Sequence, residues 1–127
     1  MTLLLLVADD LMVSSRIELV AKHLGYELLS VRTPAAFEAG VERDPQLILL
    51  GTHATRLDWV ALLQSLKARA SAPPVLVFGP HADAETRRRA REAGATRWIA
   101  NSRLAEALPS IIEAMISGAP VASELED

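Results

Sequence analysis

Five short apolar runs alternate with longer stretches of helical periodicity along most of the chain. The runs are Leu3 to Val7, Glu27 to Val31, Leu47 to Leu50, Val75 to Phe78 and Arg97 to Ala100. Such alternation is typical of strands joined by crossover helices, which build a parallel sheet with helices on its faces. The sequence therefore predicts five repeats of a strand followed by a helix.

The first, third and fourth runs are apolar at consecutive positions rather than at every second position. This pattern indicates strands covered on both faces, so these three should lie in the middle of the sheet. With right-handed crossovers, the order predicts a three-layer, doubly wound (βα)5 α/β domain. Its parallel sheet should have the flavodoxin-like strand order 2-1-3-4-5.

Between the runs, apolar residues recur at the spacing of one face of an α-helix. The stripes are Ile17, Val20, Ala21 and Leu24, then Trp59, Leu62, Leu63 and Leu66, and finally Leu104, Leu108, Ile111, Ile112 and Met115. A shorter helix should begin at Pro34 with Thr33 as its N-cap. The spacing of Thr55 and Asp58 predicts a capping box for the helix that carries the second stripe.

The helix expected from about His81 to Ala93 offers only small residues to the sheet, namely Ala82, Ala90 and Ala93. It should be the most loosely held of the five, with Gly94 as its C-cap. Its outer face is rich in arginine.

The chain has 127 residues, of which 50% are hydrophobic, so it can bury one core and should fold as a single domain. We expect this domain to span residues 1–117. Residues 118–127 contain a glycine, a proline and three acids, which predicts an acidic flexible tail or the start of a linker. The chain could then be a regulatory part of a larger polypeptide.

Composition excludes several classes of function. The 13 basic and 16 acidic residues give a net charge of -3, which argues against nucleic-acid binding by the domain itself. Leu3 to Val7 is far shorter than a membrane span. The absence of cysteine excludes disulfides and cysteine zinc sites and favours the cytoplasm. No cofactor motif is present, and we expect none to be bound.

Polar and small residues follow the predicted strands at the edge where such sheets bind ligands. They are Asp9 and Asp10, then Gly51, Thr52 and His53, then Gly79, Pro80 and His81, and finally Asn101 and Ser102.

Residues 2–117 resemble the receiver domain of two-component response regulators, the CheY-like fold. The resemblance lies in the order and spacing of the stretches "LLLLVADD", "DPQLILLGTHATRLDWVALLQSLKA" and "PPVLVFGPHADAETRRRAREAGATRWIANS". In such receivers an acidic pair after strand 1 and an aspartate ending strand 3 hold Mg²⁺, and that aspartate accepts a phosphoryl group. Ser or Thr after strand 4 and Lys after strand 5 contact the phosphate.

This chain departs from that pattern at three of the four positions. Gly51 occupies the phosphoacceptor position, Gly79 the Ser/Thr position, and Asn101 with Ser102 the Lys-Pro pair. Asp9 and Asp10 fit the acidic pair, although counting back from Gly25 pairs Ala8 with Asp9 instead. Without a carboxylate at Gly51 no aspartyl phosphate can form, so the resemblance implies a pseudo-receiver that signals through protein contacts and is not an enzyme.

The side chains at this edge allow a second hypothesis. Asp9, Asp10, His53 and His81 could bind a transition metal or a small molecule, since histidine and carboxylate are zinc ligands. The acids could equally cap the first helix, and the histidines could be solvated. Thr52 could act as a hydroxyl nucleophile, although no base or phosphate loop accompanies it.

A third group of residues points to a protein partner, to a homodimer, or to both. Receivers use the surface formed by helix 4, strand 5 and helix 5 for such contacts. In this chain the candidates are Arg87, Arg88, Arg91, Trp98 and Arg103. An arginine run can also be a solvated helix face, and Trp98 would anchor an interface only if exposed.

Overall fold

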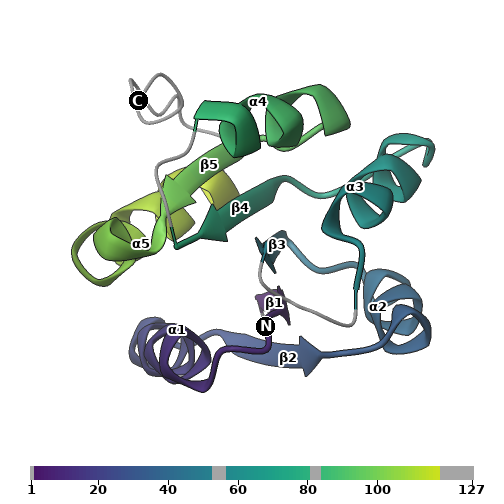
Figure 1. The fold of residues 1–127 in the computed structure, drawn as a ribbon. Coiled ribbons are helices and arrows are strands. Elements are labelled where there is room, and N and C mark those ends of the chain that lie inside the picture. Colours follow the sequence, from purple (N-terminus) through teal and green to yellow (C-terminus); the bar gives the residue numbers. More distant parts are fainter. Residues whose placement is uncertain (1, 53–56, 81–83, 118–127) are drawn as a thin grey trace.

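A computed structural model describes residues 2–52, 57–80 and 84–117 (Figure 1). The strands are β1 (Leu3–Val7), β2 (Glu27–Val31), β3 (Leu47–Gly51), β4 (Val75–Gly79) and β5 (Arg97–Ala100). The helices are α1 (Leu11–Leu24), α2 (Pro34–Val41), α3 (Trp59–Lys67), α4 (Ala84–Ala93) and α5 (Asn101–Ser117). All strand pairs are parallel, and the order β2-β1-β3-β4-β5 confirms the predicted topology.

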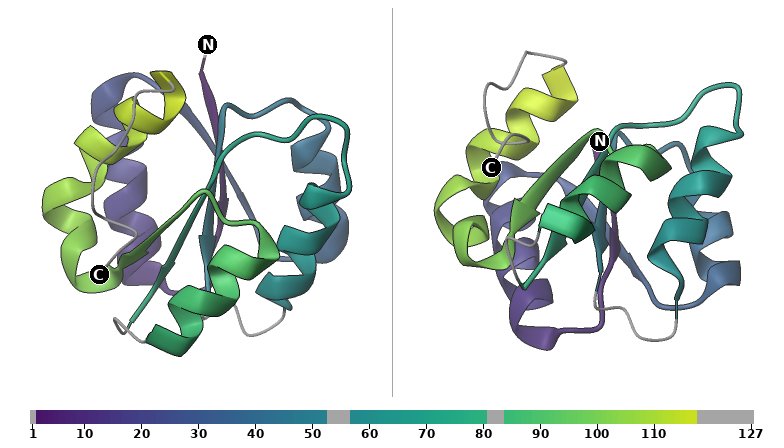
Figure 2. Two further views of the ribbon diagram at one scale, coloured as in Figure 1. Left: turned by 90° about the horizontal axis from the view of Figure 1, so that it is seen from above. Right: turned by 45° about the horizontal axis from the view of Figure 1, so that its top comes forward.

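The sheet lies between two layers of helices, as the edge-on view on the left of Figure 2 shows. Buried apolar side chains form one core on each of its faces. Helices α1 and α5 cover one face, and α2, α3 and α4 cover the other. Successive residues of β1 alternate between the cores: Leu4 and Leu6 face α1 and α5, whereas Leu5 and Val7 face the opposite layer. Strands β1, β3 and β4 are buried throughout, which confirms their central position.

Two of the helix boundaries follow the expected chemistry. The hydroxyl of Thr33 accepts a hydrogen bond from the backbone N–H of Ala36, and Pro34 opens α2 as predicted. Gly94, with φ of 111°, follows α4 in a conformation that only glycine adopts without strain. The N–H groups of Gly94 and Ala95 bond back to carbonyls of α4, so the predicted C-cap is confirmed.

Helix α3 begins later than the capping-box spacing predicted. Asp58 is its N-cap, and its Oδ1 accepts from the N–H of Ala61 at 3.1 Å, so it cannot also be the third helical residue of a box. Thr55 lies outside the described residues, as do His81, Ala82 and the 118–127 segment. No helix in the described part of the chain is long and apolar enough to cross a membrane.

Candidate functional site

The carboxyl ends of four strands surround a cavity of about 50 Å³. Its lining residues are Ala8, Asp9, Asp10, Val13, Gly51, Thr52, Phe78, Gly79, Pro80 and Asn101. The structure therefore brings together the residues expected at this edge from β1, β3, β4 and β5. It adds Phe78 and Val13, which sequence reasoning did not place here. His53 and His81 lie outside the described residues.

The two acids after β1 have different positions. The carboxylate of Asp10 caps α1, because its Oδ1 accepts from the N–H of Met12 at 2.9 Å and of Val13 at 3.4 Å. Ala8 is buried beside the strand end, and Asp9 is partly buried in the cavity wall. Asp10 thus serves as the helix cap that the sequence allowed, so Asp9 is the better placed of the two acids to face a ligand.

The space beside Gly51 is filled by an aromatic ring. A Cβ atom on Gly51 would lie 3.0 Å from Cε2 and 3.1 Å from Cζ of Phe78, and 3.4 Å from the carbonyl oxygen of Val7. Gly51 and Phe78 are also paired in register across β3 and β4. A side chain at position 51 must therefore displace the ring, which is 3% exposed.

A second glycine at the site is covered in the same manner. A Cβ atom on Gly79 would lie 2.5 Å from Oγ1 of Thr52 and 2.9 Å from Cη2 of Trp98. The Thr52 hydroxyl is thus packed over Gly79. Both positions that carry oxygen side chains in receivers are here covered by neighbouring side chains.

Trp98 is a core residue and not a surface anchor. It is 4% exposed and belongs to the core beneath α2, α3 and α4. Since a partner can contact only exposed atoms, its candidacy as a docking residue is corrected. The indole of Trp98 packs against Gly79 of β4. It occupies the space that a side chain at position 79 would fill, which explains why a large aromatic residue fits at position 98.

Asn101 is the first residue of α5 and lines the cavity. Its Oδ1 is buried and has no hydrogen-bond partner in the part of the chain that the structure describes. A buried acceptor of this kind is usually satisfied by water or by a ligand donor. Asn101 carries no positive charge, so it cannot replace a lysine as the counter-ion of a phosphoryl group.

The described residues contain no group of three His, Asp or Glu side chains that could hold a metal ion. Because position 51 is glycine, only two carboxylates line the cavity, those of Asp9 and Asp10, and Asp10 is also the N-cap of α1. The described part of this edge therefore lacks the cluster of three carboxylates that the resemblance to receivers implies for Mg²⁺.

The arginines of α4 divide into separate roles. Arg88 forms ion pairs within the helix, with Nη2 2.5 Å from Oε1 of Glu85 and Nη1 2.7 Å from Oε2 of Glu92. The hydrogen bonds that Arg88 donates to Glu85, and then those to Glu92, raise its pKa. Arg88 is exposed and shares its guanidinium with two glutamates of its own helix.

Arg89 stacks over the ring of Trp59 in α3, with its guanidinium carbon 5.3 Å from the ring centroid. Arg87 and Arg91 are each two residues from Arg89, so they lie about 200° around the helix from it and away from α3. They are one turn apart and share a side of α4. Arg91 is exposed and Arg87 is partly exposed.

A basic residue in β5 was missed from the sequence. Arg97 is 3% exposed and lies in the edge strand between α4 and α5. Burial, followed by the nearby charge of Arg103, lowers the pKa of Arg97. Arg103 itself is exposed on α5. The charges of Arg97 on β5 and Arg103 on α5 thus lie close enough to interact. In the sequence, only the position of an arginine inside an apolar run could have indicated the buried Arg97.

A parallel five-stranded sheet in this order, with a cavity at its carboxyl edge, is the flavodoxin-like, doubly wound fold that CheY-like receiver domains share. No family model and no curated protein matches the chain. Solved structures with this fold do match. The receiver domain of a histidine kinase from Syntrophus aciditrophicus is 21% identical, with a TM-score of 0.81 over 97% of this chain and 96% of that one.

Two further structures agree. A response regulator receiver protein from Pseudoalteromonas atlantica is 20% identical, with a TM-score of 0.77 over 93% of this chain and 99% of that one. The phosphorylated cyanobacterial phytochrome response regulator RcpA is 20% identical, with a TM-score of 0.74 over 96% and 99%. At these identities the likeness establishes the fold alone.

Proposed function

We propose that this chain is a non-enzymatic, receiver-like signalling module that acts by binding a protein partner, without aspartyl phosphorylation, in a cytoplasmic two-component-type pathway. The observation that carries this proposal is the covering of Gly51 by the ring of Phe78. The acceptor carboxylate is absent, and its place is packed as part of the core. The matching cover over Gly79 and the neutral Asn101 support the same conclusion.

The proposed docking surface consists of Arg87 and Arg91 on α4 and Arg103 on α5, the two helices that flank the buried strand β5. Its exposed positive charges favour an acidic protein surface, because electrostatic complementarity guides association and orientation. Phosphorylation is not needed to present these residues, since they belong to regular elements of the fold.

The first test uses a thermal melt with Mg²⁺ and beryllofluoride, which mimics an aspartyl phosphate. A ligand at ~100 times its dissociation constant adds about 2.7 kcal/mol of stability, and therefore several degrees to the melting midpoint. We expect no shift. A rise in the midpoint that needs both Mg²⁺ and beryllofluoride would show that a phosphoacceptor exists and would refute the proposal.

The second test concerns the docking surface. Charge reversal of Arg87 and Arg91 together should weaken capture of the native partner by about tenfold or more, because two attractive contacts become repulsive. Lys67→Glu, on an exposed residue of α3, is the matched charge-reversal control. Capture that falls equally with the control, or with neither variant, would place docking elsewhere.

The size of the cavity limits which ligands the alternative hypothesis, a ligand pocket, can involve. About 50 Å³ is far below the ~300 to 1,000 Å³ of typical small-molecule sites. Space of this size suits water or a single ion. Zinc that binds in one equivalent, and is lost on His53→Ala, would favour the metal form of this alternative.

A further inference from the structure

The outer face of α1 carries an exposed apolar patch that the docking surface above does not include. Leu11, Met12 and Leu19 are 68%, 71% and 67% exposed, and they are the large hydrophobic side chains exposed in the described residues. Single exposed apolar side chains are ordinary. Two leucines and a methionine exposed on one helix form a patch of the kind that marks an interface.

These residues are outside the core stripe of α1. Ser14, Ile17 and Ala21 are buried against the sheet. Leu19 is two residues from both Ile17 and Ala21, which places it roughly on the opposite side of the helix. Nothing in the fold of one chain therefore requires a leucine there, and burial against another surface would stabilise it.

The patch is symmetric along the helix. Leu11, Ser15 and Leu19 are spaced at i, i+4 and i+8, so they form one ridge with a small residue at its centre. Two such ridges running in opposite directions and crossing at Ser15 bring each Leu11 opposite the Leu19 of the other copy. The small serine side chain allows the helix axes to approach closely at the crossing.

The charges at the two ends of α1 fit the same antiparallel arrangement. The exposed Asp10 lies at its amino end, and Lys22 and His23 occupy its last turn. In an antiparallel pair, the basic end of each helix lies beside the acidic end of the other. The helix dipoles also oppose each other, which is favourable. A parallel arrangement would bring like charges together.

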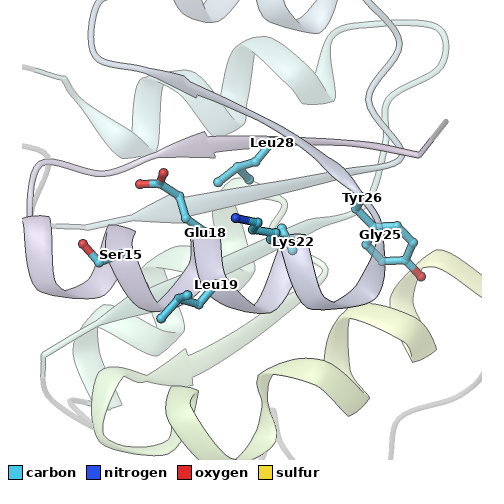
Figure 3. A pocket seen from close by; sticks show the side chains of 8 residues that line it. Ser15, Glu18, Leu19, Lys22, Gly25, Tyr26 and Leu28 are labelled. Atoms are coloured by element: carbon cyan, nitrogen blue, oxygen red, sulfur yellow. The ribbon is translucent and has the colours of Figure 1, made fainter.

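A groove borders the ridge on the side of α1 nearer to β2. It has a volume of about 590 Å³ and runs between α1 and the edge strand β2. Figure 3 shows Glu18 and Lys22 on the side of α1 nearer to β2, close to Leu28, and Leu19 on the other side. Apolar ridge, polar margin and groove therefore occupy one continuous surface.

We propose that two copies of this chain associate through α1 in a two-fold symmetric, antiparallel helix pair centred on Ser15. Such an interface is isologous, with each copy presenting the same surface. A single helix pair is smaller than the ~1,600 Å² of a standard interface, so the dimer is weak and depends on concentration. The docking surface on α4 and α5 of each copy remains open to a different partner.

Cross-linking tests the symmetry axis directly. The chain has no cysteine, so Ser15→Cys introduces one thiol at the proposed crossing with a near-isosteric change. Ser71→Cys, at an exposed serine in the loop after α3, is the matched control. Under mild oxidation we expect at least tenfold faster disulfide dimer formation by Ser15→Cys. Equal rates, or no dimer from Ser15→Cys, would overturn the proposal.

Analytical ultracentrifugation tests which surface forms the dimer. The dissociation constant is measured at protein concentrations from about 1 μM to about 500 μM, a range that covers weak protein association. Leu19→Glu should raise the dissociation constant at least tenfold, whereas Arg91→Glu should leave it unchanged. A dimer sensitive to Arg91→Glu and not to Leu19→Glu would use the other surface and refute the α1 pair. A monomer at every concentration would refute it as well. If Leu19→Glu abolishes the dimer but the variant still captures the protein partner, the α1 dimer and the proposed docking function are independent.

Discussion

Replacing Gly51 by aspartate should fail to restore a working receiver site, although it restores the side chain at the acceptor position. The reason is the ring of Phe78, whose Cε2 and Cζ atoms lie 3.0 Å and 3.1 Å from the place of the new Cβ. These contacts are shorter than ordinary van der Waals contact, so the buried ring or the strand must move.

The expected destabilisation follows from two effects. Overpacking a buried position costs typically 1 to 3 kcal/mol, and replacing glycine by alanine gains about 0.4 to 1 kcal/mol by restricting the unfolded chain. Gly51→Ala shows the balance of these two effects, and we expect a net loss of about 1 kcal/mol. Gly51→Asp adds a carboxylate near Asp9 and Asp10, where burial and like charge both disfavour ionisation. We expect a loss of about 2 to 4 kcal/mol, or roughly 10 °C in the melting midpoint.

A double-mutant cycle with Phe78→Val measures the clash itself. Phe78→Val alone removes buried ring atoms and should cost about 2 kcal/mol. If the ring is the obstacle, the double variant should be at least about 1 kcal/mol more stable than the sum of the single effects predicts. The assay is urea unfolding of the four proteins, repeated with Mg²⁺. Mg²⁺ should stabilise the double variant more than Gly51→Asp.

One result would refute this reasoning. If Gly51→Asp unfolds at the same urea concentration as the parent protein and gains several degrees from Mg²⁺ with beryllofluoride, the ring moves aside freely. The site would then be one substitution away from activity, and packing would not be what keeps it silent.

Three further predictions concern the helices. Asp10→Ala should lower the free energy of unfolding by about 1 kcal/mol in urea denaturation, and Asp10→Asn by less, because an amide oxygen can still cap α1. Pro109→Ala should raise the free energy of unfolding by about 1 to 3 kcal/mol, and the melting midpoint with it, since Pro109 interrupts the hydrogen bonding of α5. In hydrogen exchange, amides of α4 should exchange before those of α1 and α5, because only Ala90 and Ala93 are buried in α4.

The fold could be predicted because each strand signal was unambiguous in type and the topology rules left few alternatives. Boundaries were less certain. Strands β3 and β4 extend to Gly51 and Gly79, one residue beyond the apolar runs, since glycine can continue a ladder without an apolar side chain. Similarly, Thr55 and Asp58 were both plausible caps by type, and only the folded chain distinguishes them.

The candidate site was predictable in its location but not in its packing. Because ligands bind at the carboxyl ends of parallel strands, the sequence identified which residues converge there. That Phe78 and Trp98 pack against Gly51 and Gly79 depends on strand register and side-chain rotamers. A signal was nevertheless present: residue 51 pairs with residue 78 once the order of the strands is assumed. The exposed Leu11, Met12 and Leu19 were visible too, as apolar residues outside the core stripe of α1.

The two covered glycines indicate how this domain relates to a working receiver. In a cluster of carboxylates, metal binding must offset like-charge repulsion, and the apo protein bears that cost. Here the acid at position 51 is missing, and apolar contact occupies the space, so the edge of the sheet is held by packing instead of by an ion. A switch needs two arrangements of similar free energy. An edge packed in this way favours one arrangement, which suits the module we propose, one that presents fixed surfaces on α1 and on α4 and α5 rather than one that changes state.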